Sequence, residues 1–172
     1  MQGAVLDGPR DVRFEERPAP TIVEPTDAII RLSATCICGS DLWPYRGVNP
    51  ITEPTPMGHE YCGIVEEVGR GATSIKKGQF VIGSCFASDN TCPHQGTYQR
   101  HRRRRGPRMR WHAGSDDASD RYLPDLIDRV LKGQMNPGKV FDLTLPLHEV
   151  AEGYRAMDER RAIKTLLRPQ GD

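Results

Sequence analysis

The chain has 172 residues, enough for one domain with a sizeable core. Its 24 basic and 23 acidic residues nearly cancel, so no overall field favours nucleic acid or a membrane surface. No apolar run approaches the ~18 residues of a membrane span, and no signal peptide is visible at the N-terminus. The five cysteines lack the regular spacing of a disulfide framework, so we expect a reduced, cytoplasmic setting.

Short strands separated by turns are predicted for the first half of the chain. Two strands are expected within residues 1–17, and residues 27–36 alternate between two faces. Residues 61–68 and 79–82 are rich in β-forming side chains. The chain also has 14 prolines and 17 glycines, which favour turns. We therefore expect a mainly β chain with a few helices (α+β), arranged as a small barrel or sandwich.

A glycine pair at Gly69-Arg70-Gly71 begins like a dinucleotide-binding fingerprint. The third glycine of that fingerprint is absent, and no helical pattern follows. We therefore predict a turn between strands at this position.

Two short stretches carry the side chains with the most chemistry. Cys38, His59 and Glu60 offer a thiolate, an imidazole and a carboxylate, which are the groups that hold zinc in catalytic sites. Ser40 and Asp41 add a hydroxyl and a second carboxylate beside them. Structural alternatives stay open for each: a buried thiol, a hydrogen-bonded loop histidine, a strand-edge carboxylate, a helix cap for Ser40 and a helix-start carboxylate for Asp41.

The stretch Cys38-Gly39-Ser40-Asp41, followed by Gly58-His59-Glu60, resembles the first half of the metal site in zinc-dependent medium-chain alcohol dehydrogenases. The similarity extends over residues 1–94. It implies a GroES-like β-barrel catalytic domain with zinc as cofactor, NAD or NADP as hydride acceptor, and a small alcohol or aldehyde as substrate. It also implies roles for individual residues: Cys38 and His59 as zinc ligands, Glu60 as an alternate ligand or neighbour of the ligands, Asp41 as the group that orients the ligand histidine, and Ser40 as the proton relay.

The resemblance weakens after the barrel. Residues 87–94 resemble the entry to the family's structural-zinc lobe, but no cysteine follows Cys92, so we predict that this lobe is not built. Residues 95–120 contain a dense arginine run and then an acidic run, without hydrophobic periodicity. This composition predicts a disordered linker, with nucleic-acid binding as the less favoured alternative.

The last fifty residues regain a regular pattern and the resemblance. Apolar spacing predicts a helix over 121–131, a strand over 140–145, a helix after Pro146 and a terminal strand over 162–167. In the dehydrogenase family this end of the chain packs back onto the barrel. The predicted organisation is a barrel (1–94), a linker (95–120) and a completing segment (121–172), without a Rossmann domain.

The third zinc ligand of the family comes from a region that this chain lacks. Glu60, Cys36, Asp89 or Cys92 could replace it, although packing is the favoured role of Cys36. Trp43 could line a substrate pocket or pack in the core. We therefore expect an impaired alcohol dehydrogenase that is monomeric and binds no membrane. A catalytically inert zinc-binding module or a truncation remnant is the alternative.

Overall fold

The structure is a computed structural model that describes residues 1–83 and 118–169. Contacts divide the chain into two units, Met1–Cys85 with Val140–Asp172, and Phe86–Lys139. Residues 87–94, where we predict that the structural-zinc lobe is not built, and nearly all of the predicted linker lie outside the described residues. Within the described ranges, no helix is long and apolar enough to cross a membrane.

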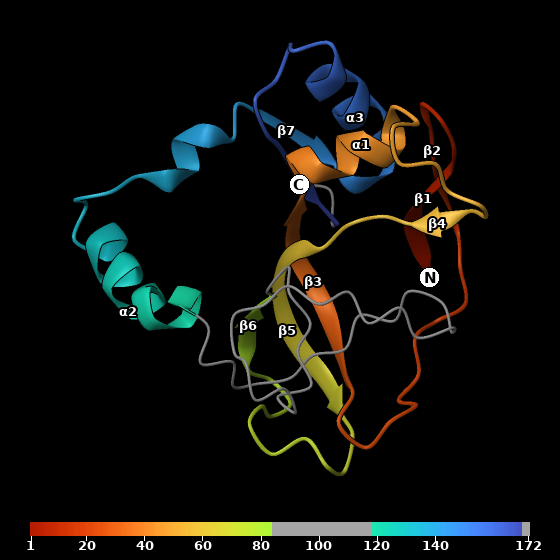
Figure 1. Cartoon of the computed structure of the whole chain (residues 1–172). Helices are drawn as coiled ribbons and strands as arrows, with labels where there is room; N and C mark the ends of the chain where they lie inside the picture. The colour runs from red at the N-terminus through yellow and green to blue at the C-terminus, as the bar shows by residue number, and fades with distance from the viewer. Residues whose placement is uncertain (84–117, 170–172) are drawn as a thin grey trace. The chain divides into compact units, whose positions relative to one another are not determined.

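The first unit is built from two β-sheets (Figure 1). A three-stranded sheet has the order β2-β1-β4, with β1 (Gln2–Gly8), β2 (Asp11–Glu16) and β4 (Thr55–Pro56). A five-stranded sheet has the order β6-β5-β3-β8-β7, with β3 (Ala28–Cys36), β5 (Glu60–Val68), β6 (Phe80–Ile82), β7 (Leu143–Pro146) and β8 (Thr165–Arg168). Strands β7 and β8 pair in parallel, and the other pairs are antiparallel.

Short helical elements connect these strands. They are η1 (Gly39–Asp41), α1 (Leu42–Tyr45), η2 (Pro137–Val140), η3 (Leu147–Glu149) and α3 (Val150–Asp158). Helix α3 links the parallel strands β7 and β8, because parallel neighbours need a crossover connection. The expectation of a mainly β chain with a few helices is confirmed.

The C-terminal part of the first unit packs into the same core as the N-terminal part. Val150, Tyr154 and Met157 on α3 are buried, and the Tyr154 ring lies 5.3 Å from that of Tyr45. A side chain at Gly153 would lie 2.7 Å from Ile37 Cδ1, so the helix approaches the end of β3 closely. Strand β8 also pairs directly with β3.

The turn after β5 is confirmed as a structural turn. The Gly69 amide donates to the Asp27 carbonyl at 2.8 Å, and the Gly71 amide donates to the Pro25 carbonyl at 2.7 Å. A Cβ atom at Gly69 would lie 2.3 Å from the Pro25 oxygen, so glycine is needed for this close approach. The two glycines therefore allow the turn to pack against residues 24–27, and they do not form a phosphate-binding loop.

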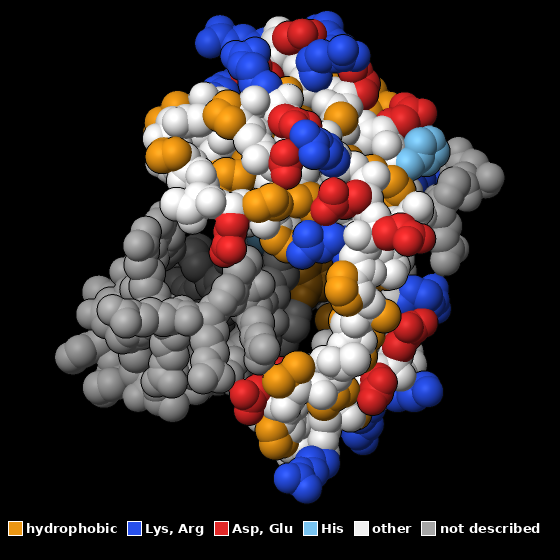
Figure 2. All heavy atoms as spheres, turned by 90° about the vertical axis from the view of Figure 1, so that its right-hand side faces the viewer, with side chains coloured by type: hydrophobic (Ala, Val, Ile, Leu, Met, Phe, Trp, Pro, Cys, Tyr) orange, Lys and Arg blue, Asp and Glu red, His pale blue; other side chains and the backbone are white. Residues whose placement is uncertain are grey.

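The second unit contains α2 (Ala118–Leu131), which confirms the predicted helix. Leu126, Ile127 and Val130 are exposed on it. In the first unit, acidic and basic side chains alternate over the face that Figure 2 shows and do not separate by sign. The described surface seen there therefore offers no single-sign patch for a polyanion.

Candidate metal centre

Three potential metal ligands converge where β3 ends and β5 begins. The two strands are antiparallel, and Cys36 is the register partner of Glu60. Cys38 follows β3, and His59 directly precedes Glu60 at the start of β5. As a result, one ligand atom each from Cys38, His59 and Glu60 lies within 4.8 Å of the other two.

Backbone geometry on both sides explains this convergence. Gly58 has a backbone φ angle of 110°, which residues other than glycine rarely adopt. This residue turns the chain just before His59. On the other side, the chain leaves β3 through the η1 turn, which begins after Cys38. All three candidate ligands are half-buried, so they are accessible to an ion from solvent.

Asp41 contacts two of the three candidate ligands. Its Oδ2 accepts the Cys38 amide at 3.0 Å, and its Oδ1 lies 3.2 Å from His59 Nδ1. Burial raises the pKa of Asp41, while the Cys38 amide and His59 act in the opposite direction. When the Nδ1 proton is donated to Asp41, the Nε2 lone pair of His59 is left for a metal.

Ser40 does not cap the helix, so that structural alternative is wrong. The helical turn starts one residue after Cys38, and the Asp41 carboxylate satisfies the Cys38 amide at its beginning. The Ser40 hydroxyl instead lies 3.2 Å from Cys38 Sγ and 3.4 Å from His59 Nε2. Its hydroxyl therefore stands at the edge of the ligand cluster.

Glu60 receives two donors on a single oxygen. Cys36 Sγ lies 2.8 Å and Lys164 Nζ 2.6 Å from Glu60 Oε2. Burial by itself would raise the pKa of Glu60, but the hydrogen bonds from Cys36 and Lys164 outweigh it and lower that pKa. Burial, together with the hydrogen bond to Glu60, raises the pKa of Cys36 to about 12, so this side chain is a protonated donor at neutral pH.

Sequence reasoning did not find Lys164 or the residue that fixes it. The Asp142 carboxylate accepts the backbone amides of Ile163 at 2.9 Å and Lys164 at 3.2 Å. No motif marks Lys164, because it is 104 residues from Glu60 in the sequence. The resemblance of the C-terminal stretch to the family was the one available signal that this segment returns to the site.

The remaining candidates are not among the clustered ligand atoms of the described residues. Trp43 is 56 % exposed, so its alternative role in core packing is wrong. Cys36 is absent from the cluster of mutually close ligand atoms. Asp89 and Cys92 lie outside the described residues.

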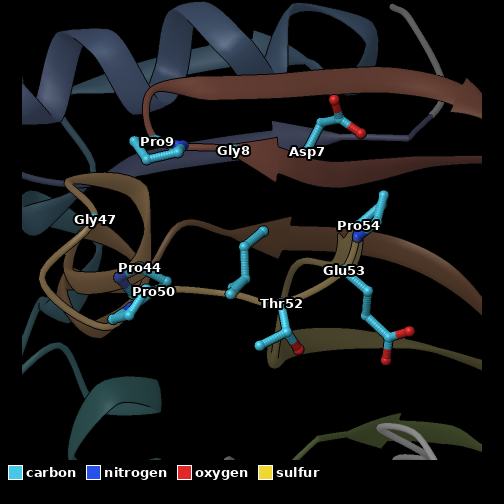
Figure 3. A pocket seen from close by; sticks show the side chains of 10 residues that line it. Asp7, Gly8, Pro9, Pro44, Gly47, Pro50, Thr52, Glu53 and Pro54 are labelled. Atoms are coloured by element: carbon cyan, nitrogen blue, oxygen red, sulfur yellow. The ribbon is translucent and has the colours of Figure 1, made fainter.

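A separate hollow of about 260 Å³ lies between the β1–β2 turn and the loop after α1 (Figure 3). It is lined largely by prolines and glycines, with Asp7 and Glu53 as its charged side chains. Asp7 pairs with Arg13 at 3.0 Å. None of the candidate metal ligands lines this hollow.

The ligand cluster suits zinc better than the hard divalent cations. A thiolate and an imidazole are zinc ligands, whereas magnesium and calcium take oxygen ligands. Three protein groups also leave a fourth tetrahedral position for water or substrate, as in catalytic zinc sites. The orienting carboxylate on the far nitrogen of the histidine completes this arrangement.

Comparisons with known proteins agree with the geometry. Residues 24–115, more than half of the chain, match the family model of the alcohol dehydrogenase GroES-like domain. The chain therefore belongs to this family, and the expected GroES-like fold is confirmed. The described residues contain no Rossmann domain.

The relatives include zinc-type alcohol dehydrogenases. Zinc-type alcohol dehydrogenase B of Aspergillus flavus is 40 % identical over 92 residues, which cover 54 % of this chain and 22 % of that protein. The apo form of zinc dependent alcohol dehydrogenase 2 from Streptococcus pneumonia is 39 % identical, with a TM-score of 0.50 over 54 % of this chain and 27 % of that one. The chain thus spans about a quarter of the length of the relatives that it matches.

Alcohol dehydrogenase TADH from Thermus sp. ATN1 shares the fold over a longer stretch. Its TM-score is 0.79, and the match covers 98 % of this chain and 99 % of that one. Since the identity is 15 %, this likeness concerns the fold and not the site.

Proposed function

We propose that the chain binds one zinc ion through Cys38, His59 and Glu60, as part of an alcohol dehydrogenase. The observation that carries this proposal is the convergence of their three ligand atoms within 4.8 Å. The zinc-type relatives support the proposed zinc site, because the family match includes the part of the chain that holds all three residues. In this proposal Glu60 replaces the third ligand that the family takes from elsewhere.

The protein groups around the site suit the oxidation of an alcohol to an aldehyde or ketone. Bound zinc would supply Lewis acidity, which lowers the pKa of an alcohol. Ser40 Oγ, beside Cys38 and His59, would take the hydroxyl proton and pass it towards solvent. Asp41 would keep His59 in one tautomer and orientation throughout. The hydride would pass to NAD or NADP.

Hydride transfer also needs a positioned nicotinamide, since orientation supplies much of the rate enhancement. The relatives are about four times longer than the matched stretch, and the described residues include no nucleotide-binding sheet. We therefore propose that the chain by itself turns alcohols over weakly. A zinc-binding module without turnover is the second candidate. The absence of a nucleotide-binding sheet from the described residues favours it.

Zinc content tests the proposal directly. We expect about one zinc per chain in metal-washed protein, and its loss in Cys38→Ala and His59→Ala. The matched controls are Cys62→Ala and His148→Ala, a half-buried thiol and an exposed histidine outside the cluster. Zinc that persists in both ligand variants would contradict the proposed site.

Alcohol oxidation with NAD and NADP then separates the two candidates. Turnover by the zinc-loaded chain that is lost in Ser40→Ala would support the dehydrogenase. Zinc binding without turnover for any alcohol tested would support the inert module.

A further inference from the structure

Donors from two segments of the chain hold Glu60 in place. Its Oε2 accepts from Cys36 Sγ at 2.8 Å and from Lys164 Nζ at 2.6 Å. Its backbone carbonyl also accepts the Thr35 hydroxyl at 2.7 Å. Three contacts from two distant segments therefore fix both ends of one residue.

These contacts have a consequence for any ion in the cluster. Cys36 and Lys164 restrain the carboxylate through Oε2, while one of its oxygens lies within 4.8 Å of the candidate ligand atoms of Cys38 and His59. The lysine is fixed in turn, since Asp142 accepts its backbone amide at 3.2 Å. Such partners behind a ligand orient it and reduce the entropy lost when the metal binds.

We infer that Cys36 is a positioning residue that, together with Lys164, orients the carboxylate of Glu60 towards the metal. This inference rests on the proposed zinc site and assigns it a second layer of residues. The thiol of Cys36 is a donor to Glu60 and is absent from the cluster of mutually close ligand atoms. The role requires Cys36 to act through Glu60 and not on the metal itself.

The neutral thiol allows a cleaner test than the lysine does. Replacing Lys164 by methionine would remove a hydrogen bond but also a positive charge near the cation, and these changes have opposite effects on metal affinity. Replacing Cys36 by alanine removes the donor without changing the charge. Replacement by serine keeps a donor at the same position.

The experiment is a Co²⁺ titration of the full chain, monitored by visible absorption and by thiolate-to-cobalt charge transfer. We expect Cys36→Ala to weaken Co²⁺ binding about ten-fold, within the usual range for partners of metal ligands. Cys36→Ser should recover most of the affinity, and Cys62→Ala should leave it unchanged. In a Glu60→Gln background, Cys36→Ala should have no further effect.

The charge-transfer band decides whether Cys36 is itself a ligand. At saturating Co²⁺, the intensity expected for one thiolate ligand, unchanged in Cys36→Ala, would support the positioning role of Cys36. A band that falls by half in both Cys36 variants would overturn it, since serine cannot replace a thiolate ligand.

Affinity separates this inference from the proposed function. If the unchanged chain binds Co²⁺ and Cys36→Ala binds it equally well, the positioning role is overturned while the zinc site stands. If the unchanged chain binds no Co²⁺ and no zinc, the proposed site itself is overturned and the inference with it.

Discussion

Two ionic links tie the C-terminal segment, residues 140–169, to the N-terminal part of the first unit. In one, Asp158 at the end of α3 pairs with Arg46 at 2.6 Å and Arg10 at 3.0 Å. In the other, Lys164 pairs with Glu60 at 2.6 Å. Both join segments that are far apart in the sequence, but they differ in burial and in what they fix.

The difference separates holding the fold from arranging a site. The Asp158 side chain is 7 % exposed, and its partners lie on the β1–β2 turn and after α1. Loss of this buried carboxylate would leave two arginines from separate elements without their common partner. Lys164 and Glu60 are 23 % and 32 % exposed, so solvent screens them and their free energy of interaction is small. In the proposed site, the second link therefore orients a candidate ligand more than it stabilises the fold.

The largest effect on stability is expected for Asp158→Ala. We predict a loss of about 2 kcal/mol in the free energy of unfolding, below the usual range for fully buried pairs because both arginines reach solvent. Urea unfolding measures the loss. Co²⁺ affinity under conditions where the variant is folded should not change.

Glu159→Ala is the matched control for this variant. Glu159 is the next residue, and its exposed side chain pairs with Arg161. Its replacement should change stability by less than ~0.5 kcal/mol. Equal effects of the two substitutions would remove the special role that we give to Asp158.

The local parts of the fold could be predicted from the sequence, because local patterns mark each element. Alternation predicted β3, β-forming side chains predicted β5, and helical apolar spacing predicted α3. Prediction from local patterns failed for β4, where Thr55 and Pro56 carry no pattern and pair only through their position opposite β1. It also placed the strand β7 three residues early, since residues 137–140 form a helical turn.

The candidate site divides in the same way. The spacing from Cys38 to Asp41 keeps these residues within one turn, so their proximity follows from the sequence. The contact between Lys164 and Glu60 depends on β8 pairing with β3, and no local pattern contains that pairing. The second layer of the site therefore needed the three-dimensional structure.

A smaller effect is expected for Lys164→Met. The pair is partly exposed, and we predict a loss of about 0.5 kcal/mol in the free energy of unfolding. The methionine keeps the apolar stem of the lysine, so packing changes little. Urea unfolding of Lys164→Met and Asp158→Ala under the same conditions compares the two losses in the free energy of unfolding. A loss as large as that of Asp158→Ala would show that the second link holds the fold as well.

The smallest effect concerns the carboxylate that fixes the lysine's backbone. Amides of Ile163 and Lys164 lower the pKa of Asp142 below its ordinary value of about 3.9. A carboxylate with a lowered pKa stabilises the fold above its ordinary pKa, and this contribution is lost as the pH falls through its pKa in the folded chain. Asp142→Asn should therefore lower the urea midpoint slightly and by a constant amount above about pH 5.

Below about pH 4 the unchanged chain should lose this advantage, so the two midpoints should converge as the pH falls. The control is Glu66→Gln, which removes an exposed carboxylate paired with the Arg31 side chain instead of backbone amides. Its midpoint should stay close to that of the unchanged chain throughout, because the pair is exposed on both sides. The urea midpoints of Asp142→Asn and of the unchanged chain could instead differ by a constant amount down to pH 3. That result would mean that the amides do not favour the charged carboxylate. The backbone of Lys164 would then be held by the adjoining strand alone.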